Sequence, residues 1–125
     1  MIKCLVLPSA GYRLISLVGA IKYLHEVKYY ERKNIKEIYG VSAGSWVGAL
    51  ICLTDDWDDI VDYIINRPYN NMYKFKFDDY INTIQNKGII NVDMIRNFGK
   101  PVFDSKDIDI DTVTLKEFYD ITKIK

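Results

Sequence analysis

The stretch from residue 38 to residue 54 restricts the fold of this chain most, because it contains no charged residue. It begins as a short apolar run, passes through Gly40-Val41-Ser42-Ala43-Gly44, and continues as an apolar stretch rich in small residues. This order predicts a buried strand that ends at Gly40, a sharp turn, and a helix over residues 43–53. The glycines and serines within it favour a buried core segment over a membrane span.

A second strand-and-helix unit precedes this one. Residues 2–7, IKCLVL, form a β-branched apolar run that predicts a buried strand ended by Pro8. Apolar residues then recur at helical spacing and predict a helix over residues 13–28. A helix between two buried strands favours parallel pairing with a right-handed crossover. We therefore expect an α/β fold, a three-layer α/β/α sandwich with a mainly parallel sheet.

The rest of the chain predicts short helices. One is capped by Thr54 or Asp55, has an acidic first turn and stops before Pro68. Two more are expected over residues 77–85 and 92–98, the second closed by Gly99, and residues 99–112 are expected to form an exposed loop. Thr114 and Glu117 form a capping box that starts a last helix, and the terminal KIK is expected to lead into a further strand.

Composition excludes several classes of function. A chain of 125 residues supports one domain, and a net charge of zero does not indicate a nucleic-acid partner. Cys4 and Cys52 have no CxxC spacing and lie in apolar runs, which predicts buried thiols in a reducing compartment. No metal-ligand spacing or cofactor motif is present, so we expect neither a metal nor a cofactor. No signal peptide is recognisable, which predicts an intracellular protein, cytoplasmic or peripheral to membranes.

Tyrosine is abundant in this chain. A group of them could form an aromatic surface at an interface, although tyrosines in so Tyr-rich a chain are more often at the edge of the core. The residues concerned are Tyr29, Tyr30, Tyr69, Tyr73 and Tyr80.

Ser42 lies between two glycines in a G-x-S-x-G pattern, which by chance would occur in roughly one or two of a hundred such chains. The strand before it and the helix after it are the context in which this pattern forms a nucleophile elbow. Gly40 and Gly44 leave room for the neighbouring strand and helix, and the N–H of Ala43 is placed to stabilise developing negative charge. The alternatives are a serine with a structural role in the turn, or a small-anion site at the helix N-terminus.

A nucleophilic serine needs a base, and the chain has one histidine, His25. It precedes Ser42, whereas the α/β-hydrolase order is serine, acid, then histidine, so that triad is excluded. We expect His25 to be an ordinary residue on the face of the first helix.

Two segments, LVLPSAGYRLISLVGAIKYL and YGVSAGSWVGAL, are similar to those of a known family, and so, more weakly, are NKGIINVDMIRNF and TLKEFYDITKIK. On these segments the chain resembles the patatin-like phospholipases. It covers essentially the whole sequence, which corresponds to the N-terminal half or so of a typical domain of this family. The resemblance implies that residues 1–125 are the N-terminal part of such a domain, truncated before the later strands.

The resemblance also implies roles for individual residues. Ser42 would be the nucleophile of a Ser-Asp dyad, the backbone N–H groups around Ser9, Ala10 and Gly11 would form the oxyanion hole, and Arg13 matches the basic residue of that loop. The family loop has the form G-G-G-x-R-G, so Ser9, Ala10 and Leu14 replace glycines here. The family aspartate lies in an Asp-Gly motif, and no Asp-Gly dipeptide occurs in these residues.

These implications lead to two functional hypotheses. The first is a serine acyl hydrolase that acts on lipid acyl esters at a membrane surface, with this chain alone weak or inactive because its aspartate is missing. The second is a non-catalytic patatin-like remnant that binds lipid or protein. In either case a sheet without its later strands has an open edge, through which copies of the chain could associate.

Overall fold

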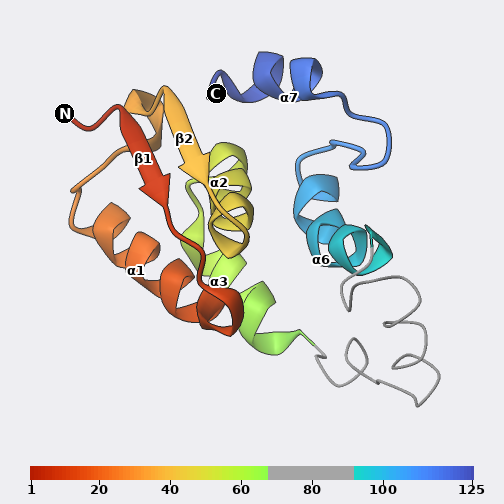
Figure 1. Cartoon of the computed structure of the whole chain (residues 1–125), viewed down its shortest axis with the longest axis horizontal. Helices are drawn as coiled ribbons and strands as arrows, with labels where there is room; N and C mark the ends of the chain where they lie inside the picture. Colours follow the sequence, from red (N-terminus) through yellow and green to blue (C-terminus); the bar gives the residue numbers. More distant parts are fainter. Residues whose placement is uncertain (68–91) are drawn as a thin grey trace. The chain divides into compact units, whose positions relative to one another are not determined.

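A computed structural model describes residues 1–67 and 92–125 (Figure 1). They fall into two compact units, the first made of residues 1–65 and 113–125 and the second containing residues 66–112. The helix expected over residues 77–85 and the tyrosines at positions 69, 73 and 80 lie outside the described residues.

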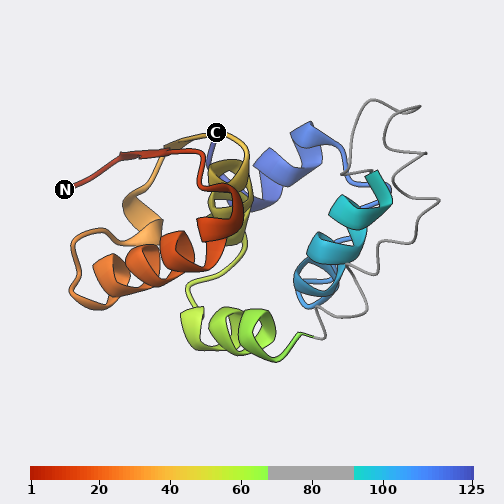
Figure 2. The same ribbon diagram turned by 60° about the horizontal axis from the view of Figure 1, so that its bottom comes forward.

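The first unit contains a parallel pair of strands, β1 (Cys4–Leu7) and β2 (Glu37–Gly40), with Cys4 opposite Glu37 and Leu7 opposite Gly40. The helix α1 (Leu14–Glu26) connects them, and α2 (Ala43–Leu53) follows β2 directly. Both helices lie on the same side of the two strands (Figures 1 and 2). The predicted α/β fold with parallel strands joined by a helical crossover is confirmed.

The core of this unit lies between the strands and the helices α1 and α2. Leu7 from β1 and Val18 from α1 are buried, and α2 buries almost its whole length. The largest fully buried side chains are Val18, Ile35, Val47 and Ile51. Tyr30 is also buried, as expected for a core-edge tyrosine, and this burial raises its pKa, whereas Tyr29 is exposed.

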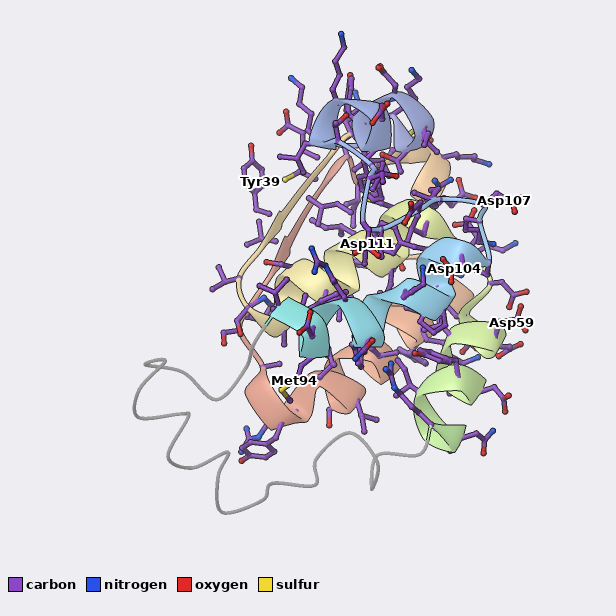
Figure 3. All side chains as sticks on the ribbon, turned by 90° about the vertical axis from the view of Figure 1, so that its right-hand side faces the viewer. Tyr39, Asp59, Met94, Asp104, Asp107 and Asp111 are labelled. Atoms are coloured by element: carbon purple, nitrogen blue, oxygen red, sulfur yellow. The ribbon has the colours of Figure 1, made fainter. Side chains whose placement is uncertain are left out.

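The opposite face of the two strands is exposed. Val6 and Tyr39 lie on it, and Figure 3 shows Tyr39 pointing away from the ribbon. Cys4 shares this face and is exposed, so the prediction that both cysteines are buried is wrong for Cys4. Cys52 is buried within α2, and desolvation raises the pKa of its thiol to about 11.

The outer edge of β2 is paired at one point with the end of the chain. The N–H of Lys125 donates to the carbonyl of Lys36 at 2.9 Å, and its carbonyl accepts from the N–H of Ile38 at 2.7 Å. This two-bond pattern is the one by which parallel strands pair. The segment after α7 (Leu115–Thr122) therefore runs beside β2, as the sequence predicts for the residues that lead into a further strand.

Two of the remaining helices begin with local caps. The start of α7 is the predicted capping box, in which Thr114 and Glu117 bond each other's backbone N–H, and these hydrogen bonds lower the pKa of Glu117. The helix α3 (Trp57–Asn66) begins one or two residues later than predicted, since neither Thr54 nor Asp55 is its cap. Its cap is the carboxylate of Asp56, which accepts the N–H of Asp59 at 3.3 Å.

The second unit corrects one prediction. Its helix α6 (Val92–Asp104) continues past Gly99 and Pro101, so neither the stop at Gly99 nor a loop from residue 99 is correct. Pro101 has no N–H for the carbonyl of Asn97, four residues earlier. The guanidinium of Arg67 donates to that carbonyl and to the carbonyl of Phe98, which satisfies the group that the proline leaves unpaired.

Candidate active site

The predicted elbow lies where β1 and β2 both end. Because the strands are parallel, their C-terminal ends lie at the same edge of the sheet. The pairing continues one residue further, since the N–H of Val41 donates to the carbonyl of Leu7 at 3.2 Å. The loop after β1 and the turn after β2 are therefore neighbours.

Ser42 has the backbone conformation of a strained turn. Its φ is 53° and its ψ is −119°, a region that residues with a Cβ rarely occupy and that costs roughly 1–3 kcal/mol. It is the N-cap residue of α2 and is exposed. The surrounding strand and helix must hold this conformation, because nothing in the local sequence other than the flanking glycines favours it.

The hydroxyl of Ser42 does not cap the helix. A serine at this position usually accepts a hydrogen bond from the second or third N–H of the helix. Here the N–H of Gly44 goes to the carbonyl of Val41 at 2.9 Å, and that of Ser45 goes to the carbonyl of Ser42 at 3.0 Å. Ser45 makes a different structural contact, since its hydroxyl donates to the carbonyl of Gly40 at 2.8 Å. This arrangement leaves the Ser42 hydroxyl available for chemistry.

The two glycines of the motif are required by close backbone contacts. A Cβ on Gly40 would lie 2.6 Å from the backbone N and Cα of Ser45. A Cβ on Gly44 would lie 2.4 Å from the carbonyl oxygen of Leu7 and 2.6 Å from that of Pro8. Real Cβ atoms do not approach backbone so closely, so glycine is required at residue 40 for the turn itself and at residue 44 for the close approach of α2 to the end of β1 and the loop after it.

The loop after β1 keeps glycine where its backbone needs it. Gly11 has a φ of +50° and opens a short 3₁₀ helix, whereas Ala10 has a φ of −128° and Leu14 is in the right-handed helical region. Ser9 is not among the described residues with positive φ. The replacements of the family glycines at Ser9, Ala10 and Leu14 thus fall at positions where a side chain causes no backbone strain.

Three backbone N–H groups at this edge are candidates for an oxyanion hole. In the part of the chain that the structure describes, the N–H groups of Ala10, Gly11 and Ala43 donate to no backbone carbonyl. Ala43 is the first residue of α2, where the helix dipole favours negative charge. Arg13 is exposed beside them, and its guanidinium lies 5.7 Å from the ring centre of Tyr12.

No base accompanies the serine among the described residues. His25 lies in the last turn of α1, about 16 Å along the helix axis from its start near this edge, and its Nε2 lies 3.7 Å from a carboxylate oxygen of Asp55. The structure thus places His25 on the helix face, as expected. No described carboxylate accepts a hydrogen bond from the Ser42 hydroxyl, and no described group of three His, Cys, Asp or Glu side chains could hold a metal ion.

The aspartates of residues 104–111 belong to the second unit, where Figure 3 labels Asp104, Asp107 and Asp111. Asp104 pairs with Lys100 at 3.3 Å, and Asp111 pairs with Arg96 at 2.9 Å. Asp109 accepts the N–H of Asp111 and the hydroxyl of Thr112, which lowers its pKa. Three of these carboxylates therefore have local structural partners.

The family model of the patatin-like phospholipases matches residues 5–118 of this chain. The chain belongs to the patatin-like phospholipase family. A curated relative, "Uncharacterized protein R571" of Acanthamoeba polyphaga mimivirus, is 28% identical over 94 residues, which cover 75% of this chain and 31% of the relative. The chain thus spans a little under a third of that relative's length. No solved structure matches this chain. Among the described residues no helix is long and apolar enough to cross a bilayer.

Gly11→Ala tests the loop of this patatin-like site. Because Gly11 has a positive φ, a Cβ there costs about 1 kcal/mol and is expected to turn the neighbouring N–H groups away from Ser42. We expect labelling of the serine by a fluorophosphonate probe to slow by up to about a hundredfold, the lower end of what the loss of one oxyanion donor costs. Ala10→Gly, at a φ of −128°, is the matched control and should label at the wild-type rate; equal rates for the two variants would contradict the assignment of this loop.

Proposed function

We propose that this chain carries the nucleophile and the oxyanion hole of a serine hydrolase that acts on lipid acyl esters. Membership of the patatin-like phospholipase family supports the reaction class. The observation that carries the proposal is Ser42, which is held at a φ of 53° with an exposed hydroxyl that no helix cap uses. Strain of this kind is found at functional sites, where the surrounding structure maintains it.

In the proposed reaction the Ser42 oxygen attacks the ester carbonyl carbon and forms an acyl–oxygen bond. The carbonyl oxygen becomes an oxyanion, which accepts hydrogen bonds from the N–H groups of Ala43, Gly11 and Ala10. The carbon–oxygen bond to the alcohol then breaks, and the alcohol leaves with the proton that the serine gave to the base. Water later hydrolyses the acyl-enzyme by the same steps in reverse order.

The proposed base is a residue beyond these 125. We propose that the chain is the N-terminal part of a patatin-like domain and that an aspartate on a further segment completes the dyad. The absence of an Asp-Gly dipeptide and the pairing of Lys125 with the edge of β2 support this. Loss of the base leaves a residual 10³–10⁴-fold rate over water in the serine proteases, so this chain alone should be a slow esterase.

The alternative is a non-catalytic module that keeps the elbow for lipid or protein binding. Its support is that no described carboxylate lies in hydrogen-bonding contact with Ser42. Both proposals agree with two free thiols, one of them exposed, which fit a reducing compartment, and a lipid substrate would place the protein at a membrane surface. The backbone groups of Cys4 and Val6 point away from β2, and we propose this edge as the route of any self-association; sedimentation analysis would measure it.

A fluorophosphonate probe tests the nucleophile. We expect covalent labelling of the wild-type chain that is slow because the base is missing, and none of Ser42→Ala, because the probe phosphonylates an accessible serine that its site makes reactive. The matched control is Ser45→Ala, three residues away and also exposed, which loses a structural hydrogen bond but not the nucleophile. Intact-mass spectrometry measures the adduct. Labelling that persists in Ser42→Ala would remove the nucleophile assignment, and an unlabelled wild-type chain would favour the non-catalytic module.

A further inference from the structure

The edge of the sheet that carries Ser42 is almost without charge. Residues 4–21 contain a single charged side chain, Arg13, and residues 38–54 contain none, although 27% of the whole chain is charged. These two segments include β1, the last three residues of β2, and the loop and turn that follow the strands, so both pass through the C-terminal edge of the parallel pair. The opposite edge begins near Lys3 and Lys36. Along these two segments the edge is therefore apolar, with one cation and no carboxylate.

Apolar side chains at this edge are exposed. Tyr12 in the loop after β1 is 89% exposed, Val41 in the turn after β2 is 63% exposed, and Ile15 in the first turn of α1 is 54% exposed. Single exposed apolar residues are common on soluble proteins. These three are grouped by topology, since all of them flank the elbow, and the only charge among them is Arg13, which lies against the ring of Tyr12.

We propose that Tyr12, Ile15 and Val41, with Arg13 beside them, form a docking rim that inserts into the interfacial region of an anionic phospholipid bilayer. This inference rests on the proposed function. Tyrosine is favoured at the level of the lipid headgroups, where its ring is in apolar surroundings and its hydroxyl is hydrated. Arginine can bury its stem in the same region while its guanidinium meets a lipid phosphate.

The position of the rim matches the chemistry of the substrate. The acyl ester bonds of a phospholipid lie at the boundary between headgroups and chains, which is the depth to which a surface-bound apolar face inserts. Ser42 lies at the same sheet edge as the rim and is exposed. A chain docked through the rim presents its elbow to the ester carbonyls without extracting the lipid from the bilayer.

Vesicle binding tests the rim without any chemistry. Vesicles made of ether-linked phosphatidylcholine, alone or mixed with ether-linked phosphatidylglycerol, cannot be hydrolysed at an acyl ester, and co-sedimentation measures the partition coefficient. We expect weak, reversible binding that is tighter on the mixed vesicles. Tyr12→Ser should lower the partition coefficient about tenfold on both kinds of vesicle. Arg13→Gln should lower it about fivefold on the mixed vesicles only.

The matched control is Tyr23→Ser, on the helix α1 that follows the loop. Tyr23 is 62% exposed, but it lies eight residues beyond Ile15, about 12 Å further along the helix axis and away from the elbow. It should bind as the wild type does. An equal loss in Tyr23→Ser, or a wild-type chain that binds neither vesicle, would overturn the proposal, and the second result would leave a protein partner as the occupant of the rim.

A fluorescence measurement tests the rim even if Tyr12→Ser or Tyr23→Ser fails to fold. Tyr12→Trp should shift its emission to the blue when mixed vesicles are added, whereas Tyr23→Trp should not. This readout is independent of the fluorophosphonate test, so that failure of the nucleophile assignment and failure of the docking rim would be told apart. A Tyr12→Trp emission that does not change on vesicles to which the chain binds would exclude insertion of the rim.

Discussion

Gly44→Ala is expected to lower the free energy of unfolding by about 3 kcal/mol. Gly40→Ala should cost about as much, and we expect these two losses to be the largest among the glycines of the first unit. The Cβ added at Gly44 would lie 2.4 Å and 2.6 Å from two carbonyl oxygens of the strand and loop in front of α2. These are backbone atoms of Leu7 and Pro8, which cannot rotate aside as a side chain does. The helix must therefore move away from β1, which breaks the packing that holds Ser42 in its strained conformation.

Urea unfolding followed by tryptophan fluorescence measures this loss, because Trp57 is buried in the same unit. A loss of that size lowers the midpoint by about 2 M urea at a typical slope for a small protein. Gly19→Ala is the matched control. Its Cβ would have no heavy atom within 4 Å, and in the interior of α1 alanine should raise stability by about 0.5–1 kcal/mol. Equal midpoints for the two variants would show that the close approach at Gly44 does not exist.

Gly48→Ala should fall between these two. Its nearest neighbour would be a methyl group of Ile38 at 3.0 Å, and a side chain can yield where a backbone carbonyl cannot. The order Gly19, Gly48, Gly44 thus follows the rigidity of what each Cβ would meet. That order is a property of the elbow, because the helix has to approach β1 closely for the loop and the turn to share one edge.

The parts of this fold that the sequence predicts are those decided by neighbouring residues. The helix over residues 43–53 and the strand end at Gly40 follow from the change of pattern around Ser42, and both are confirmed. The capping box at Thr114 depends on two residues three positions apart and is also confirmed. Local chemistry determines these features, so no knowledge of distant contacts is needed to recognise them.

The features that the sequence does not predict depend on distant partners. The helix α6 passes Pro101 because Arg67, about thirty residues earlier, takes up the carbonyl that the proline leaves unpaired. Cys4 is exposed because the helices of this unit lie against the other face of the strands, which an apolar run cannot reveal. In both cases the outcome depends on a distant part of the chain that contacts the segment or leaves it exposed, and the segment's own sequence does not contain that information.

For the candidate site too, the sequence predicts the features that depend on neighbouring residues and not those that depend on the folded backbone. The positions of Ser42, Ala43 and Gly11 at one edge follow from the motif and from parallel strands. Their roles stay predictions. The sequence could not show that side chains at Ala10 and Leu14 cause no backbone strain, since the family pattern has glycine at both positions. The backbone shows it, because Gly11 alone has a positive φ in this loop.

Arg32→Met is the second prediction with a large expected effect, and it concerns the far end of α2. The last carbonyls of a helix have no partner within the helix. Arg32 is half-buried, and its guanidinium donates to the carbonyls of Ile51 (at 2.9 Å) and Cys52, both in a buried stretch of α2. The positive charge of Arg32 also lies at the negative end of the helix dipole, which it stabilises. Methionine keeps the apolar stem but leaves two buried carbonyls unpaired, so we expect a loss of about 2–4 kcal/mol.

Urea midpoints again measure the change, and two further variants show whether the cap is its cause. Arg32→Lys keeps the charge but has no planar fork to reach both carbonyls, so it should lose about half as much. Lys33→Met changes a neighbouring cation whose side chain is 76% exposed and pairs with Glu31 at 3.3 Å, and it should cost less than about 0.5 kcal/mol. If Lys33→Met destabilised the chain as much as Arg32→Met, the effect would be one of general charge. If only Arg32→Met does so, α2 is held at both of its ends by backbone contacts: through glycine against β1 at the elbow, and through arginine at its carbonyls. A helix fixed in this way can keep Ser42 in a conformation that its own side chain disfavours.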